Sequence, residues 1–300
     1  MSLLSDNVNN MITYSFIVPH KNAPELLRFC LRSIPRRNDV QIIVVDDNSD
    51  TEIVDFENFP GLGDPSVEVY LTKENNGAGY ARNVGLQHAL GKWLIFADAD
   101  DFFSEKINEA LDEYKDSNAD VVFLKNIAVK IPSGEPSMRG VELNRRVDIA
   151  IETGDFTQAI LYSSPWQKFF KKSFIESNHI RFNEVRWGND VVFMGKVAAA
   201  ATSFEASNKI IYCLTESDNS IIKDPSLASR IVRFEQESEN VRILRSTKYR
   251  NEPSVYYWHF RTWFNIWKMS KWQAILRIPH AIRTAGVFFL KNAFKAKFSE

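Results

Sequence analysis

The chain has 300 residues, 44% hydrophobic and 25% charged, with a formal net charge of -1. This is the composition of an ordinary globular protein, and it excludes a disordered or low-complexity chain. Cys30 and Cys213 are the two cysteines, and their spacing fits neither a disulfide framework nor a zinc site. With no signal sequence at the N-terminus and no apolar run near the ~18 residues of a membrane span, the sequence predicts a cytoplasmic protein.

The charge is unevenly distributed along the chain. Residues 241–300 contain 12 Lys and Arg against two acids, whereas the first 240 residues contain 25 basic and 36 acidic side chains. A basic tail on an acidic body indicates a tail that meets an anionic surface. The acidic body argues against nucleic acid as a partner, because it would repel the phosphates.

Strand and helix patterns alternate over the first hundred residues, which predicts a parallel, doubly wound sheet. The predicted elements are a strand over 14–18 ending at Pro19, a helix over 23–34, strands over 40–45 and 67–71, a loop over 75–79, a helix over 80–90 and a buried strand from Trp93.

The pattern is looser after Asp101, and the predicted sheet domain ends near residue 222. The predicted elements here are a helix over 107–114, a strand over 120–129, a turn-rich loop over 132–140, a Lys-rich helix start near 168–175, a small-residue helix over 190–201 and only helices from about 225.

Three carboxylates follow the buried strand that begins at Trp93, at Asp98, Asp100 and Asp101. Unpaired charges at the end of an apolar strand are costly unless a cation meets them. Two acids separated by one residue can reach a divalent cation and a ligand oxygen beside it. The pattern therefore predicts a metal-and-phosphate site, the alternative being acids that cap a helix or form a turn.

Other polar side chains are expected at the same edge of the sheet, where parallel strands present their carboxyl ends to ligands. Asp47 is a candidate for hydrogen bonds to a nucleobase or ribose, or else caps the next helix. The loop over 75–79 opens a helix, where free backbone N–H groups favour anions, although it matches no standard nucleotide motif. Arg82, one turn into that helix, is a candidate for contact with a diphosphate, the alternative being a solvated surface residue. His20 is a candidate for contact with a phosphate.

Short motifs follow one another in a fixed order along this part of the chain. They are Ser-Phe-Ile-Val-Pro at 15–19, Ile-Ile-Val-Val-Asp-Asp-Asn-Ser at 42–49, Ala-Arg-Asn-Val-Gly-Leu at 81–86, Phe-Ala-Asp-Ala-Asp-Asp at 96–101, Pro-Trp-Gln-Lys at 165–168, Ile-Arg-Phe at 180–182 and Trp-Gly-Asn-Asp-Val-Val-Phe at 187–193. The ordered set resembles the family-two glycosyltransferases with the GT-A fold, over roughly residues 13–222. The resemblance implies an α/β fold with a Rossmann-type mixed, mainly parallel sheet flanked by helices and a C-terminal helical extension.

The same resemblance implies an activity and a division of the chain. The activity is inverting transfer of a sugar from a nucleotide-diphosphate sugar, with UDP-sugars favoured, to a hydroxyl of a glycan or lipid-linked glycan in surface polysaccharide biosynthesis. The implied division is a transferase domain over 1–222, with a nucleotide-binding half over 13–104 and an acceptor half over 105–222, and a helical extension over 223–300.

Roles for single residues also follow from the resemblance. It implies that Pro19, Asp47, Asn75 and Arg82 hold the nucleotide, that Asp98 contacts the ribose or sugar, that Asp100 binds Mn²⁺ or Mg²⁺, and that Asp190 is the general base. A metal can stabilise the charge on a departing diphosphate, so no protein acid is needed there. The acceptor hydroxyl, by contrast, needs a carboxylate to take its proton.

The chain departs from the family pattern at two positions. Asn189 stands where Glu usually precedes the base, which puts the orientation of the base or acceptor in doubt. Lys21 stands where an aromatic residue is common, so stacking on the nucleobase is lost there. The alternative for Asp190 is a helix N-cap ahead of the apolar residues that follow it.

The C-terminal segment repeats aromatic and apolar residues at helical spacing between basic ones. The apolar series is Tyr256, Phe260, Trp263, Trp267, Trp272, Ile275, Ile282, Phe288 and Phe289. This pattern is typical of a helix that lies in a membrane interface, here the inner face of the cell membrane. The alternative is helices that pack on the catalytic domain or a second subunit. A non-catalytic nucleotide-sugar-binding or membrane-scaffolding subunit is the alternative function.

Overall fold

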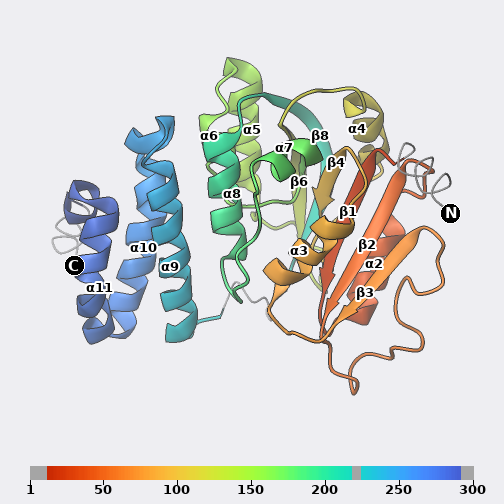
Figure 1. Cartoon of the computed structure of the whole chain (residues 1–300), viewed down its shortest axis with the longest axis horizontal. Coiled ribbons are helices and arrows are strands. Elements are labelled where there is room, and N and C mark those ends of the chain that lie inside the picture. The colour runs from red at the N-terminus through yellow and green to blue at the C-terminus, as the bar shows by residue number, and fades with distance from the viewer. Residues whose placement is uncertain (1–11, 218–223, 292–300) are drawn as a thin grey trace. The chain divides into compact units, whose positions relative to one another are not determined.

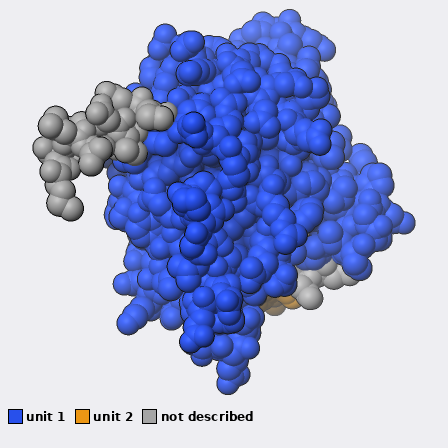
Figure 2. Space-filling model, turned by 90° about the vertical axis from the view of Figure 1, so that its right-hand side faces the viewer, with its two compact units in different colours: residues 1–159, 165–186, 201–217 blue, residues 160–164, 187–200, 218–300 orange. Residues whose placement is uncertain are grey.

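The computed structural model describes residues 12–217 and 224–291 (Figure 1). The chain forms two compact units, which are coloured separately in Figure 2. The first comprises residues 1–159, 165–186 and 201–217, and the second comprises residues 160–164, 187–200 and 218–300. The predicted domain boundary at residue 222 lies outside the described residues, as does the N-terminal segment before residue 12.

Within the described residues, the first unit is built on an eight-stranded sheet with the order β3-β2-β1-β4-β7-β6-β8-β5. The strands are β1 (Tyr14–His20), β2 (Val40–Asp47), β3 (Val67–Thr72), β4 (Trp93–Phe96), β5 (Phe102–Phe103), β6 (Val121–Lys130), β7 (Lys168–Lys171) and β8 (Phe204–Glu216). The helices before residue 178 are α2 (Pro24–Ser33), α3 (Ala78–His88), α4 (Lys106–Tyr114), α5 (Val141–Thr153), α6 (Thr157–Ile160) and α7 (Lys172–Ser177).

The sheet is mixed and mainly parallel, as the sequence predicts. β1 pairs in parallel with β2 and with β4, so that Ile17 lies opposite both Ile43 and Phe96. β7 runs antiparallel to β4 and β6, and β8 is parallel to β6. Both β1 and β2 are buried along their whole length, as expected for strands inside a parallel sheet. The carboxyl ends of β2, β1 and β4 therefore lie next to one another.

Two local predictions are wrong. β1 continues through Pro19 to His20, because its pairing with β4 stops at Ile17 and no ladder bond on that side is lost at Pro19. Residues 168–171 form β7, and helix α7 begins only at Lys172. Phe169 and Phe170 are fully buried between β4 and β6, and this packing outweighs the helical pattern.

Helix α3 packs closely on β1 and β2 because it carries a glycine where it crosses the sheet. A Cβ placed on Gly85 would lie 2.4 Å from Ile17 Cγ2. This close approach fixes α3 against the middle of β1.

We expect Gly85→Ala to lower the free energy of unfolding by about 1 kcal/mol, because overpacking costs about 2 kcal/mol and the better helix propensity of Ala returns about 1 kcal/mol. Urea unfolding measures the change, and combining it with Ile17→Ala, which removes the clashing methyl, should make the two effects non-additive. An unchanged unfolding midpoint in the single variant would contradict this packing.

The second unit is helical in its described part. Its elements are α8 (Asn189–Ala200), α9 (Leu227–Leu244), the 3-10 turn η2 (Lys248–Asn251), α10 (Pro253–Met269) and α11 (Lys271–Ala285). α9 packs against α8, α10 and α11 (Figure 1). The helical prediction from residue 225 is confirmed for the residues described. Within those residues, no helix is both long and apolar enough to cross a membrane.

The aromatic series of the C-terminal segment is divided between the core and the surface of this unit. Tyr256 and Trp263 are buried, and Trp263 donates from Nε1 to Ala274 O at 3.0 Å. His259 and Phe289 complete the core with Phe234, on which His259 stacks. Packing between helices thus explains Tyr256, Trp263 and Phe289, three of the nine residues in the apolar series.

Candidate active site

The ends of β1 and β2 are joined by a buried histidine–aspartate pair. His20 Nε2 accepts from Ala23 N, so Nδ1 carries the proton and donates to Asp46 Oδ1 at 2.7 Å. Burial acts to raise the pKa of Asp46, but hydrogen bonds from His20 and Ser49 outweigh it and hold that pKa below its usual range. Because both ring nitrogens of His20 are bound inside the protein, its expected contact with phosphate is wrong.

Asp47 organises the loop that leads into α3. Its Oδ1 accepts from Asn76 N at 3.0 Å, and its Oδ2 accepts from Gly77 N at 2.7 Å. Lys21 Nζ bridges the same region, donating to Asp47 O at 2.9 Å and to Asn75 Oδ1. Asp47 therefore anchors the loop from beneath, while Asn75 is exposed at its tip.

Arg82 is not a solvated surface residue. It is 6% exposed, its Nη2 donates to Asp98 Oδ1 at 2.6 Å, and its guanidinium lies 5.3 Å from the centre of the Phe182 ring. A buried charge of this kind has to be paired. The ion pair connects the first turns of α3 to Asp98, two residues after the end of β4.

The three carboxylates after β4 form a cluster. One oxygen each of Asp98, Asp100 and Asp101 lies within 4.8 Å of the others. Asp101 is buried and accepts from Thr215 N at 2.7 Å, whereas Asp100 is exposed. In the described part of the chain, Asp101 Oδ2 has no hydrogen-bond partner.

The electrostatics of this cluster favour a cation. Loss of solvation and the negative charge of Asp98 raise the pKa of Asp100 to about 6. Burial and the charges of Asp100 and Asp98 raise the pKa of Asp101 well above its usual value. Carboxylate oxygens are the ligands that Mg²⁺, Mn²⁺ and Ca²⁺ prefer, so the donor set fits a hard divalent ion.

Arg139 is a cation beside the cluster that the sequence analysis missed. Its Nη1 donates to Thr215 O at 2.8 Å, and its charge acts to lower the pKa of both Asp100 and Asp101. It ends the turn-rich loop before α5 and stands in no motif, so nothing in the local sequence marks it.

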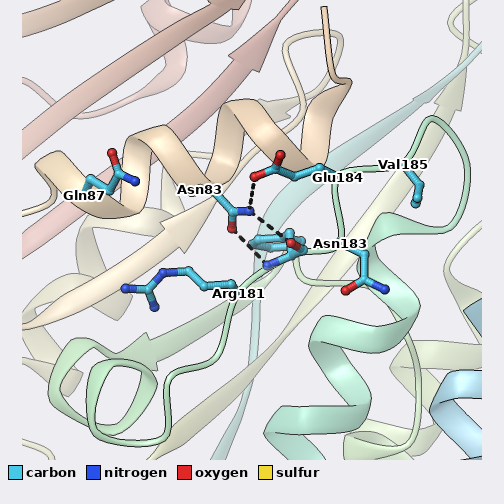
Figure 3. A pocket seen from close by; sticks show the side chains of 7 residues that line it. Asn83, Gln87, Arg181, Asn183, Glu184 and Val185 are labelled. Atoms are coloured by element: carbon cyan, nitrogen blue, oxygen red, sulfur yellow. Dashed lines mark hydrogen bonds between the residues drawn. The ribbon is translucent and has the colours of Figure 1, made fainter. Parts of the chain in front are cut away.

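A polar pocket of about 470 Å³ lies beside α3 (Figure 3). Asn83, the residue after Arg82, is one of the residues that line it. The Asn83 side chain fixes one side of the pocket. Its Nδ2 donates to Phe182 O at 2.9 Å and to Glu184 Oε1 at 3.2 Å, and its Oδ1 accepts from Phe182 N. None of the predicted site residues lines it. The contacts fix residues 181–185 along the helix.

Asp190 belongs to the second unit, where it is the second residue of α8. The helix begins at Asn189, so the N-cap alternative for Asp190 is wrong. Its charge interacts with Arg233 and Glu237 of α9.

Comparison with known proteins identifies relatives of this chain. Residues 15–185 match the family described as Glycosyl transferase family 2. The poly(ribitol-phosphate) beta-glucosyltransferase of Bacillus spizizenii is 28% identical over 188 residues, which cover 60% of this chain and 28% of that protein. The poly(ribitol-phosphate) beta-N-acetylglucosaminyltransferase TarS of Staphylococcus aureus is 25% identical over 216 residues, 69% of this chain and 36% of that protein. The chain thus spans about a third of the length of these two relatives.

The fold has a counterpart among solved structures. The crystal structure of S. aureus TarS 1-349 in complex with UDP-GlcNAc superposes with a TM-score of 0.64 and 20% identity, covering 92% of this chain and 80% of that one. At this identity the likeness concerns the fold. With a family match over more than half of its length, the chain belongs to glycosyl transferase family 2.

Proposed function

We propose that this protein is an inverting glycosyltransferase that moves a sugar from a UDP-sugar to a hydroxyl of a surface polymer or lipid-linked glycan. The observation that carries the proposal is the cluster of Asp98, Asp100 and Asp101 at the carboxyl end of β4, paired with Arg82, in a member of glycosyl transferase family 2. UDP-GlcNAc is the first donor to test, because TarS was crystallised with it. Poly(ribitol phosphate) is the first acceptor, because two relatives are named for it.

The donor side of the proposed site has contact residues and supporting residues. Pro19 and the exposed Asn75 are proposed to meet the nucleotide, and Asp98 the ribose or sugar. Asp47 and Arg82 are proposed to support nucleotide binding through the residues that they hold in place. The Asp47 side chain holds the loop that carries Asn75, and the Arg82 side chain holds Asp98.

Asp100 is the proposed ligand of Mn²⁺ or Mg²⁺, with Asp98 and Asp101 beside it. A divalent ion bound there would neutralise charge that develops on the diphosphate leaving group. Arg139, next to the same carboxylates, would add a fixed positive charge at this end of the sheet.

On the acceptor side, Asp190 is the proposed general base. Its carboxylate takes the hydroxyl proton while the acceptor oxygen bonds to the anomeric carbon and the bond to the UDP oxygen breaks. A single displacement of this kind inverts the anomeric centre, and it needs one base rather than the two opposed carboxylates of a glycosidase.

The proposal is tested by incubating the chain with UDP-GlcNAc or UDP-glucose, Mn²⁺, and either poly(ribitol phosphate) or a lipid-linked glycan. Sugar on the acceptor, with the anomeric configuration inverted, is the expected product. Donor binding without transfer to any acceptor would favour the alternative of a non-catalytic nucleotide-sugar-binding subunit.

We also propose that the enzyme works at the inner face of the cell membrane, which it contacts through the outward face of α11. Trp272, Ile275 and Leu276 are 66%, 43% and 54% exposed, and they share one helix face with Pro279. Residues 253–291 contain six Lys and Arg and no acid. Exposed apolar side chains among basic ones match an anionic lipid surface.

Substituting Trp272→Ser should weaken binding to vesicles of phosphatidylglycerol and phosphatidylcholine by about 30-fold, because burying a tryptophan side chain in lipid contributes on the order of 2 kcal/mol. Co-sedimentation measures the affinity, and Trp258→Ser, at an exposed tryptophan of α10, is the matched control. Equal binding by all three proteins, or concentration-dependent self-association abolished by Trp272→Ser, would contradict a membrane role for this face.

A further inference from the structure

The three carboxylates of the candidate site lie in one tight turn between β4 and β5. Asp101 N donates to Asp98 O at 3.1 Å, and this hydrogen bond closes the turn over residues 98–101. One oxygen of each carboxylate lies within 4.8 Å of the others. Like charges this close repel one another, so the turn needs contacts from outside to keep its three acids together.

Those contacts come from β8, and they reach each acidic residue of the turn. The Tyr212 hydroxyl oxygen accepts from Asp98 N at 2.9 Å. Thr215 Oγ1 donates to Asp100 O at 2.7 Å, and Thr215 N donates to Asp101 Oδ1 at 2.7 Å. A single threonine therefore binds both the exposed and the buried acid at the end of the turn.

Thr215 is itself fixed by the sheet. It is 6% exposed, it pairs with Val129 of β6, and its carbonyl oxygen accepts from Arg139 Nη1 at 2.8 Å. The strand that carries it lies between β6 and β5. A strand held on both sides positions a metal ligand more precisely than a loop does.

We propose that Thr215 is a positioning residue for the metal ligand Asp100, which it orients by fixing the Asp100 carbonyl with its hydroxyl group. The inference rests on the proposed function, in which Asp100 binds a divalent ion. Asp100 is the exposed member of the cluster, so packing restrains it less than it restrains Asp101. Removing a group that orients a metal ligand typically weakens metal affinity by about 10–100-fold.

The test removes the hydroxyl group and keeps the shape of the side chain. Thr215→Val retains the branched side chain and the backbone N–H that binds Asp101, but it has no side-chain hydrogen to donate to Asp100 O. Calorimetric titration of Mn²⁺, alone and with UDP present, should show an affinity about tenfold weaker than that of the unmodified chain. Thr215→Ser, which restores the hydroxyl group, should bind Mn²⁺ as the unmodified chain does.

Thr72→Val is the matched control. Thr72 Oγ1 also donates to a backbone carbonyl oxygen, that of Asp46, at 2.8 Å, and β2 and β1 separate its strand from β4. We expect this variant to keep the Mn²⁺ affinity of the unmodified chain. A contact with only a structural role would lower Tm in both valine variants and leave the Mn²⁺ affinity of both unchanged. That result, or a Thr215→Ser chain that binds Mn²⁺ as weakly as Thr215→Val, would overturn the positioning role.

Hydrogen exchange supplies a readout that needs neither metal nor turnover. In EDTA, Thr215→Val should speed exchange of the Asp101 amide by about fivefold, because the turn that this amide closes opens more often without the hydroxyl contact. Thr215→Ser and Thr72→Val should leave the rate unchanged. An unchanged rate in Thr215→Val would also overturn the proposal. Failure of the unmodified chain to bind Mn²⁺ would instead count against the proposed function, and the exchange rates would still decide whether Thr215 holds the turn.

Discussion

Asp190→Asn is expected to abolish sugar transfer while leaving donor binding intact. The amide has the size of the carboxylate, so α8 keeps its packing on α9, but it cannot take a proton from the acceptor hydroxyl. General bases typically contribute 10²–10⁴-fold to a rate, so we expect kcat to fall by about 1,000-fold. Transfer of labelled sugar from the donor measures kcat, and calorimetric titration of the nucleotide measures the donor Kd.

Asp116→Asn is the matched control, because Asp116 is an exposed aspartate in the turn after α4. It should alter neither kcat nor donor affinity. Transfer by Asp190→Asn at the normal rate would show that another group is the base, and a parallel loss of donor binding would show that Asp190 acts in binding instead.

Asp100→Asn is expected to remove the metal dependence of donor binding. Asp100 is the exposed carboxylate of the cluster, so its replacement takes away a charged ligand without opening a cavity. We expect nucleotide affinity in Mn²⁺ to fall at least tenfold, to the level that the unmodified chain shows in EDTA. Calorimetric titration of Mn²⁺ and of the nucleotide into both proteins checks this.

Stability separates loss of a ligand from damage to the fold. Loss of solvation and the negative charge of Asp98 raise the pKa of Asp100, so removing the Asp100 carboxylate relieves both costs and should not lower Tm in the absence of metal. A lower Tm with unchanged Mn²⁺-dependent binding would make Asp100 a structural residue and exclude it as the metal ligand.

The arrangement of the donor side could be predicted from sequence because it follows from strand order. Strand and helix patterns alternate up to Asp101, and this alternation predicts parallel neighbours whose carboxyl ends meet. Pro19, Asp47 and Asp98 accordingly lie at the ends of β1, β2 and β4, which are adjacent in the sheet. Their predicted contacts with nucleotide, sugar and metal stay predictions.

The partners of these side chains could not be predicted, because they come from distant parts of the chain. Asp47 binds the amides of residues 76 and 77, and Arg82 is buried against Asp98. Arg139 reaches the acidic cluster through Thr215 of β8, a strand that the sequence analysis did not predict although Ile210 to Leu214 form an apolar run.

Helical periodicity in the C-terminal segment indicated an amphipathic pattern but not its use. An apolar stripe is the same in sequence whether it faces another helix or a lipid surface. Packing places Trp263 in the core of the second unit and leaves Trp272 exposed on α11. Only side-chain exposure separates the two uses, and it places the most exposed residue of the series, Trp272, on α11.

The central claim, a metal-dependent nucleotide-sugar site at the carboxyl end of β4, is tested most directly by calorimetric titration of UDP, GDP and CDP, each with Mn²⁺ and with EDTA. We predict that UDP binds in Mn²⁺, that EDTA weakens its binding at least tenfold, and that Asp100→Asn gives the same loss with Mn²⁺ present. Failure of all three nucleotides to bind in Mn²⁺ would contradict the claim.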